Sequence, residues 1–207
     1  MISNRSISVR TQRISAAIIV ALTAMEAIPL VFAIRHLDRV FGQPQSGWQM
    51  LGALVVAAAF IGHSARNPEI RRNLAHASWL KIPAILLAIT AGIVEEIYFR
   101  QVLMNALQSH GVGVLLQILA SGIAFGAAHA VWGAGGGWRV MRGAVVATTM
   151  LGLAVLYVLS GRAIVTCIEA HVLVDLVLEP ALIIFAVESA TRRRAGASPR
   201  PHVECLA

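Results

Sequence analysis

The sequence has few charged residues and few aromatic ones. Of its 207 residues, 13% are Asp, Glu, Lys or Arg and 6% are Phe, Trp or Tyr, while 57% are hydrophobic. Soluble domains carry about 25% charged residues and about 45–50% apolar ones. This composition excludes an ordinary soluble fold and predicts an integral membrane protein. The two cysteines, Cys167 and Cys205, are too few and too far apart to form a disulfide framework or a metal knuckle.

Long apolar stretches occur six times, each close to the ~18 residues that a membrane-spanning helix needs. The predicted spans are 14–34, 48–65, 82–108, 112–131, 140–159 and 162–189. We therefore expect an all-α fold, a polytopic bundle of about six transmembrane helices that form one domain over 14–190. A basic cytoplasmic segment, 1–13, precedes it, and a basic disordered cytoplasmic tail, 191–207, follows it. The polar stretch 66–81 is expected to be a loop.

The positive charges predict the orientation of the bundle. With a cytoplasmic N-terminus, thirteen of the seventeen Lys and Arg residues fall on the cytoplasmic side and three on the other side. Both termini are therefore expected in the cytoplasm. Because this placement explains the net charge of +7, nucleic acid is not an expected partner. The basic start followed by apolar residues 14–24 also fits a cleaved signal peptide, but Glu26 and Pro29 interrupt the run without a small-residue cleavage site.

Acidic residues are unusually frequent inside the predicted spans. Six of the ten lie well within them: Glu26, Glu95, Glu96, Glu169, Asp175 and Glu179. One ionised side chain at the centre of a span costs about 2.5–3.5 kcal/mol, so these residues need partners, water or a proton. Glu96 and Arg100 are four residues apart on one helix face and can form an ion pair. Glu95 points about 100° away. We expect Glu96 and Arg100 to hold the helix geometry and Glu95 to face a cavity as a base; a purely structural charge cluster is the alternative.

Two histidines accompany the carboxylates in later spans. His129 follows Phe125 by four residues, so that the two rings share a helix face, and His171 precedes Asp175 by four. At ~1.5 Å per residue from the outer ends of the spans, Glu95 and these polar groups reach similar depths. Taken by itself, the His171 and Asp175 pair is compatible with three roles: a catalytic imidazole oriented by the carboxylate, a metal site, or a structural hydrogen bond between the two side chains. Three helices that bring polar groups to one depth predict an intramembrane site.

The motifs Glu-Glu-x-x-x-Arg, Phe-x-x-x-His and His-x-x-x-Asp, in this order, resemble the CPBP family of intramembrane proteases. That family includes the type II CAAX prenyl endopeptidases and the bacteriocin-processing, Abi-like proteins. The resemblance covers about 81–189. It implies peptide-bond hydrolysis by water, with Glu95 as general base assisted by His129. It also implies that His171 and Asp175 contact the scissile carbonyl and the oxyanion that develops on it.

By the same resemblance, Glu96 and Arg100 support the site. Two positions depart from the family pattern. Gln101 follows Arg100, where a glycine is common, and Asp175 stands where many members have Asn. An ionised Asp cannot donate a hydrogen bond to an oxyanion. Asp175 must therefore be protonated, or it orients His171.

No cofactor is expected, because the sequence has no His-Glu-x-x-His helix. Zinc is the alternative cofactor. Its candidate ligands are Glu95, Glu96, His129, His171 and Asp175. The expected substrate is a membrane-embedded or membrane-anchored peptide or protein, and the expected location is the bacterial inner membrane, in contact with lipid. Two other functions compete. A catalytically idle partner would have lost a motif residue, and an ion-coupled transporter would show an internal repeat of interrupted helices.

Overall fold

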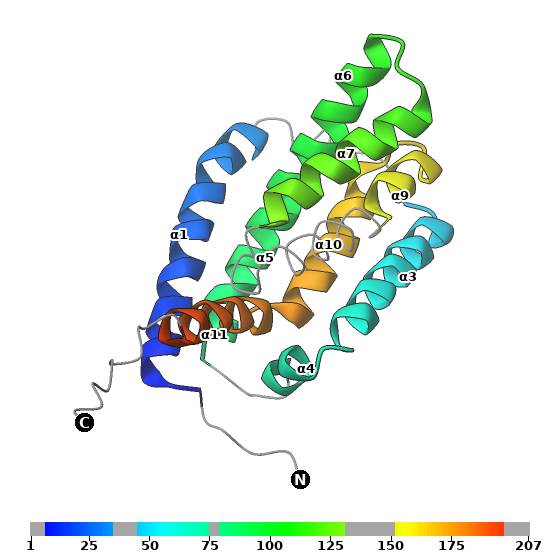
Figure 1. Ribbon diagram of the computed structural model, residues 1–207. Coiled ribbons are helices and arrows are strands. Elements are labelled where there is room, and N and C mark those ends of the chain that lie inside the picture. The colour runs from blue at the N-terminus through cyan, green and yellow to red at the C-terminus, as the bar shows by residue number, and fades with distance from the viewer. Residues whose placement is uncertain (1–6, 35–44, 75–78, 131–151, 197–207) are drawn as a thin grey trace, which may run out of the picture.

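The computed structural model describes residues 7–34, 45–74, 79–130 and 152–196, and these form helices without any strand (Figure 1). The elements are α1 (Val9–Ile34), α3 (Gly47–Ser64), α4 (Pro68–Leu74), α5 (Lys81–Glu96), the π-helical segment η1 (Ile97–Val102), α6 (Leu103–Ser109), α7 (Val114–His129), α9 (Leu153–Leu159), α10 (Ile164–Leu178) and α11 (Ala181–Gly196). The predicted all-α fold is confirmed.

Four helices lie side by side in the order α1, α5, α10 and α3, each packing against the next (Figure 1). The α6 and α7 hairpin packs on η1, and α9 fits between α7, α10 and α3. α11 crosses one end of the bundle and contacts α1 and α4. The two central helices, α5 and α10, are those that carry the predicted glutamates and the second histidine.

Three helices within the described residues are long and apolar enough to cross a membrane: Val9–Val31, Gly47–Ser64 and Lys81–Ser109. The last includes η1 and α6. α10 and α11 together would make a fourth span, bent by 54° at Pro180. α7 is a shorter apolar helix of 16 residues. Most of the predicted span 140–159 lies outside the described residues, so the structure accounts for three or four of the six predicted spans.

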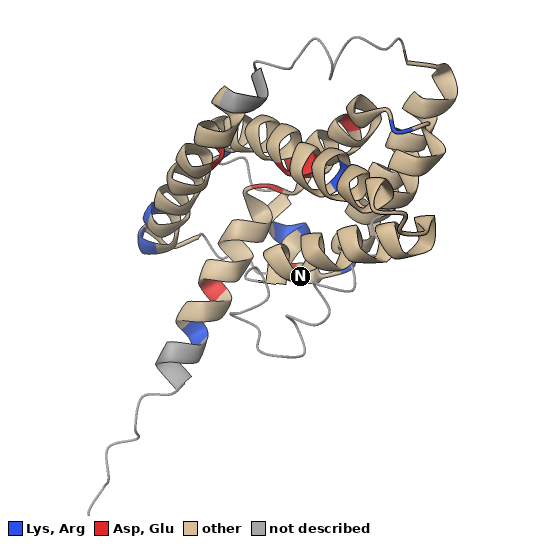
Figure 2. Ribbon diagram, turned by 90° about the horizontal axis from the view of Figure 1, so that it is seen from above, with Lys and Arg blue, Asp and Glu red and all other residues tan. Residues whose placement is uncertain are grey.

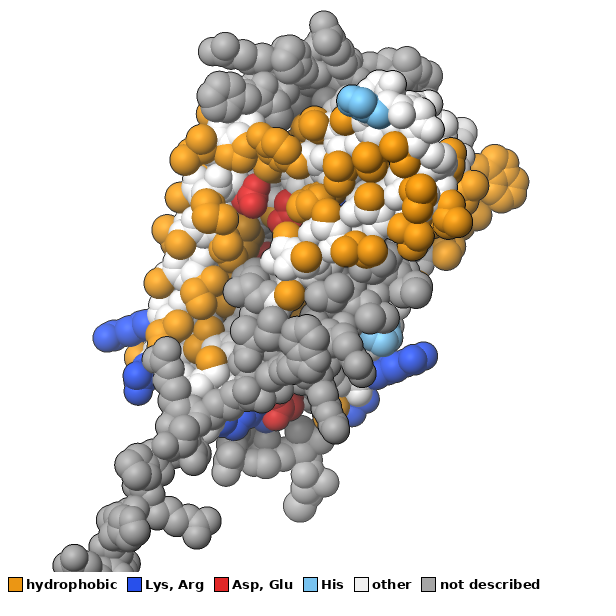
Figure 3. Space-filling view, turned by 45° about the horizontal axis from the view of Figure 1, so that its top comes forward, with side chains coloured by type: hydrophobic (Ala, Val, Ile, Leu, Met, Phe, Trp, Pro, Cys, Tyr) orange, Lys and Arg blue, Asp and Glu red, His pale blue; other side chains and the backbone are white. Residues whose placement is uncertain are grey.

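The outer faces of these helices expose large hydrophobic side chains. Examples more than half exposed are Val20, Ile28, Leu54, Ile82, Leu115 and Leu116. A continuous exposed apolar surface of this kind is rare on soluble monomers and is what a lipid environment requires. Lys and Arg side chains gather at one end of the molecule (Figure 3). This separation of an apolar belt from a charged end fits a chain embedded in a bilayer.

The expectation of a loop over 66–81 is wrong in part, because α4 forms inside it. The side-chain oxygen of Asn67 accepts a hydrogen bond from the backbone N–H of Glu69 at 2.9 Å. Pro68 takes the first helical position, where the missing N–H would have had no partner within the helix. The Asn-Pro-Glu sequence is thus a signal for a helix start. The prediction missed it because the segment is polar and was interpreted as a loop.

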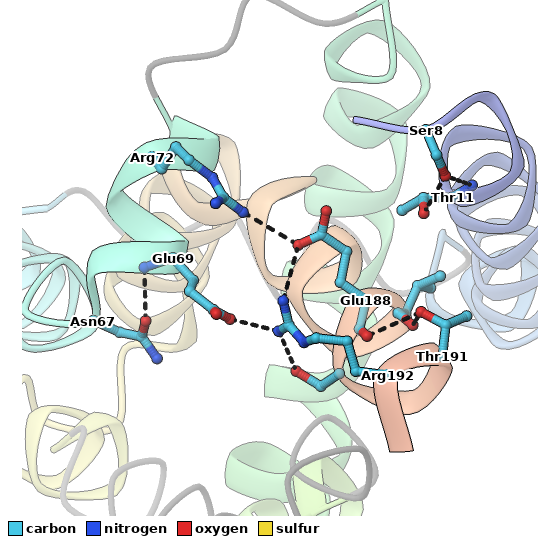
Figure 4. A network of polar contacts seen from close by, with 10 residues as sticks. Ser8, Thr11, Asn67, Glu69, Arg72, Glu188, Thr191 and Arg192 are labelled. Carbon is cyan, nitrogen blue, oxygen red and sulfur yellow. Dashed lines mark hydrogen bonds and ion pairs between the residues drawn. The ribbon is translucent and has the colours of Figure 1, made fainter. Parts of the chain in front are cut away.

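α11 continues to residue 196, into the segment predicted as a disordered tail from 191. Its end is tied to α4 by ion pairs (Figure 4). The Arg192 guanidinium donates to Glu69 at 2.7 Å, and Arg72 donates to Glu188 at 3.3 Å. These partners come from α4, which the sequence interpretation had read as loop, and they explain why the helix does not end at 191.

The opposite end of the bundle is held by Arg162, in the turn between α9 and α10. Its guanidinium donates to the side-chain oxygens of Asn105 on α6, at 2.8 Å, and of Gln117 on α7, at 2.6 Å. It also lies 5.6 Å from the centre of the Tyr157 ring. Arg162 therefore links α6, α7, α9 and the start of α10, and fixes where α10 enters the bundle.

Candidate active site

Glu96 joins the two central helices. Its carboxylate is fully buried, with Oε1 3.1 Å from Nη1 of Arg100 and 2.8 Å from Nδ1 of His171. The ion pair with Arg100, one turn further along the chain, was predicted from the spacing. The hydrogen bond to His171 was not, because it crosses from α5 to α10. Glu96 thus positions the imidazole as well as the helix that bears the glutamates.

Glu95 lies beside His129, at the end of α7. Its Oε2 is 3.4 Å from Nε2 of His129, and both side chains are about one-fifth exposed, at 20% and 18%. Nδ1 of His129 is 2.9 Å from the carbonyl oxygen of Phe125. Because a carbonyl only accepts, Nδ1 carries a proton, and in the neutral form of the ring Nε2 is then an acceptor. Glu95 and His129 together offer two acceptors to one small space.

His171 has a carboxylate at each ring nitrogen. Nδ1 contacts Glu96 at 2.8 Å, and Nε2 is 3.3 Å from Oδ2 of Asp175. An imidazolium ring, with N–H groups at both positions, satisfies both acceptors. The contact with Asp175 is the longer and therefore the weaker of the two. The nitrogen that faces Asp175 is the one that can exchange its partner.

The ring of Phe125 lies beside both histidines. Its centroid is 4.2 Å from that of His129 and 5.4 Å from that of His171, while the Arg100 guanidinium carbon lies 4.1 Å from it. The histidine ring centroids are 6.5 Å apart. Cation–π attraction at this distance adds to the ion pair that holds the buried arginine. Phe125 therefore packs against both imidazoles and against the buried guanidinium of Arg100.

Two backbone features bring these side chains together. The helix widens into the π-helical η1 directly after Glu96, an irregularity that occurs frequently at functional sites. At Gly92, one turn before Glu96, a Cβ atom would lie 2.5 Å from Cγ2 of Val172 and 3.3 Å from its backbone N. Only glycine permits this close approach of α5 to α10. It brings Glu96 within reach of His171.

The site fits a metal only in part. One ligand atom from each of Glu95, His129 and His171 lies within 4.8 Å of the others, and these are donor types that zinc accepts. Both nitrogens of His171 already face carboxylates, so a metal would have to replace Glu96 or Asp175 there. Glu95 and His129 alone fall short of the three protein ligands of catalytic zinc sites.

Residues 77–177 match the family model described as Rce1-like, type II CAAX prenyl endopeptidase. The matched segment covers 101 of the 207 residues, so this part of the chain is similar to that family. It runs from just before α5 almost to the end of α10 and contains every predicted site residue. No curated protein and no solved structure matches the chain. The apolar helices and the family together identify an integral membrane protein of an endopeptidase family.

Three further acidic residues in the predicted spans had been given no role. Glu169 accepts from the Gln45 side-chain amide at 2.9 and 3.0 Å once that amide is turned toward it, which links α10 to the segment before α3. Glu26 and Glu179 instead lie within electrostatic range of Glu95 and His171. Acidic positions on neighbouring helices also come together near the middle of the view in Figure 2. The sequence signals for this proximity were the depth of both residues in their spans and, for Glu179, its position one turn after Asp175.

Proposed function

We propose that this chain is an intramembrane endopeptidase that hydrolyses a peptide bond with a water molecule activated by Glu95. The observation that supports this proposal is the 3.4 Å distance between Oε2 of Glu95 and Nε2 of His129. Both atoms are hydrogen-bond acceptors when Glu95 is ionised and His129 is neutral. A water molecule at about 2.8 Å from each can donate one hydrogen to each of them. Glu95 takes a proton as the water oxygen attacks the carbonyl carbon, and later delivers that proton to the leaving amine nitrogen.

His171 is the proposed electrophile. Its Nδ1–H is held by Glu96 at 2.8 Å, so the Nε2–H can turn from Asp175 to the carbonyl oxygen of the substrate. As the oxyanion develops, this charged donor stabilises it in a site with little water. Before the substrate binds, Asp175 orients the ring through this Nε2–H, so the mechanism does not require an ionised Asp to donate to the oxyanion. Arg100 holds the Glu96 carboxylate in place.

We propose that the reaction needs no metal, because His171 is already engaged at both nitrogens. A zinc-dependent reaction is the second candidate, supported by the three ligand atoms within 4.8 Å of one another. If zinc binds, Glu95 and His129 would hold it with His171, and it would supply Lewis-acid polarisation of the water. Cleavage measured before and after exhaustive chelation separates the two.

The proposed substrate is a peptide or protein embedded in or anchored to the membrane, since the site lies among helices with lipid-facing outer surfaces. We place the chain in the bacterial inner membrane, with both termini in the cytoplasm, from its charge distribution. Lipid is then its main non-substrate contact, and nucleic acid is no partner.

The test uses the full chain in lipid nanodiscs and a library of membrane peptides, with cleavage followed by mass spectrometry. Glu95→Gln should lower the cleavage rate by about 10²–10⁴-fold, the range for loss of a general base. Its melting temperature should match that of the parent, because Oε2 of Glu95 makes no hydrogen bond among the described residues. Glu69→Gln, at the far end of the bundle, is the matched control. Full activity of Glu95→Ala would refute the mechanism.

A further inference from the structure

Glu26 is a carboxylate on the lipid-facing helix α1, beside the candidate active site. Its neighbours Met25 and Ile28 are 62% and 67% exposed, whereas Glu26 is partly buried. It interacts electrostatically with Glu95, His129 and His171. Figure 3 shows acidic side chains gathered in a hollow of an otherwise hydrophobic face, between α1 and α7. In the described part of the chain, no hydrogen bond or ion pair reaches Glu26.

A second acceptor lies next to Glu26 on the same helix. Pro29 lies inside α1 and has no N–H, so the carbonyl of Met25 lacks its usual helical donor. Lipid cannot supply a donor either. A carboxylate and a free carbonyl thus stand one residue apart on the membrane face of the molecule. The carboxylate and the carbonyl can each accept a hydrogen bond, and a positively charged donor group would interact with them most strongly.

The interior of the site shows the same need for a cation. Oε2 of Glu179 is buried and accepts no hydrogen bond within the described residues. Glu179 interacts electrostatically with Asp175, His171 and Glu95. Around the two histidines, the described structure therefore gathers several carboxylates against two buried cations, Arg100 and the imidazolium of His171. A positively charged substrate group would lower the electrostatic cost of this excess.

We propose that Glu26 is a specificity-determining residue that binds a lysine or arginine side chain of the substrate as it enters between α1 and α7. The ammonium or guanidinium group donates to the Glu26 carboxylate and to the Met25 carbonyl. A basic residue close to the scissile bond is thereby favoured over a neutral one. This inference rests on the proposed endopeptidase function, and it adds the class of side chain that the site selects.

The experiment uses one transmembrane peptide in which lysine is moved through successive positions around the cleavage point. Norleucine, which keeps the alkyl chain without the ammonium group, replaces lysine in the paired peptides. With the parent chain, lysine at one or two adjacent positions should raise kcat/KM about tenfold over norleucine. Glu26→Gln should abolish that ratio and leave cleavage of the norleucine peptide unchanged. Glu26→Lys should prefer a glutamate at the same position. Glu188→Gln, in the network at the end of the bundle, is the control (Figure 4).

An unchanged lysine to norleucine ratio in Glu26→Gln overturns the inference. So does an equal loss on both peptides, which would assign Glu26 to the chemistry or to the fold. Binding of the same peptides by fluorescence anisotropy, on a Glu95→Gln background, separates this test from that of the proposed function. If no peptide is cleaved but the lysine preference in binding disappears with Glu26, the endopeptidase proposal fails and the cation site stands. If neither assay shows a preference for lysine, the cation site fails.

Discussion

Adding one methyl group at Gly92 is expected to separate the two helices that build the site. The new Cβ would lie 2.5 Å from Cγ2 of Val172, against about 3.5–4.0 Å for an ordinary carbon contact. Rotation of Val172 relieves only part of the clash, because its backbone N is also close, at 3.3 Å. A retreat of α10 by about 1 Å would stretch the 2.8 Å bond between Glu96 and His171 past the limit of a hydrogen bond.

Two readouts follow from this displacement in Gly92→Ala. Overpacking should cost about 1–3 kcal/mol of stability, seen as a lower midpoint of unfolding in detergent. Misplacement of the imidazole by about 1 Å should reduce kcat about 10²-fold. Gly62→Ala is the matched control, since a Cβ there has no neighbour within 4 Å. Adding Val172→Ala to Gly92→Ala removes the methyl group in the way and should restore part of both losses.

A Gly92→Ala chain with the activity and midpoint of the parent would refute the reasoning that close contact of α5 and α10 assembles the site. A loss that Val172→Ala does not lessen would be equally damaging. It would show that the methyl group acts through something other than the contact with α10. The double variant therefore decides between a packing effect transmitted to His171 and a local effect on α5.

The other expected outcomes concern charges and metal. Arg100→Met should cost about 3–5 kcal/mol, because it removes one partner of a fully buried ion pair with Glu96, and Arg100→Lys should recover only part of this in thermal unfolding. Arg162→Met should lower stability by about 1–3 kcal/mol, because it removes the guanidinium that donates to the side-chain oxygens of Asn105 and Gln117. Its kcat should stay near that of the parent. A large loss of kcat would contradict the structural role assigned to Arg162. Chelation should leave peptide cleavage unchanged, and rescue of a chelated, inactive protein by zinc would reverse the mechanism.

Contacts within one helix were predictable from the sequence because helical geometry alone decides them. The spacing of four residues between Glu96 and Arg100, and between His171 and Asp175, was sufficient to place each pair, and the structure shows both within 3.3 Å. Depth counted along the spans was sufficient to bring Glu95 toward His129. These predictions needed no knowledge of how the helices pack.

Contacts between helices could not be predicted in the same way. The bond from Glu96 to His171 depends on how close α5 and α10 approach, and a sequence does not give that distance. Gly92 carried the signal, since a small residue one turn before the glutamates permits such an approach. The π-helical turn after Glu96 had no sequence signal, because it inserts no proline or glycine. The neighbours of Glu26 required the arrangement of α1 as well.

The shared carboxylate of Glu96 has a consequence for the order in which the candidate site is assembled. Of the two partners of Glu96, only Arg100 lies one turn away on the same stretch of helix, so this ion pair can form before α10 is synthesised. His171 arrives about seventy-five residues later, on α10, and only then takes its place on Glu96. In the proposed mechanism, Glu95 therefore has no electrophile opposite it until α10 docks against α5. The proposed peptide cleavage would then begin only once the fold is complete.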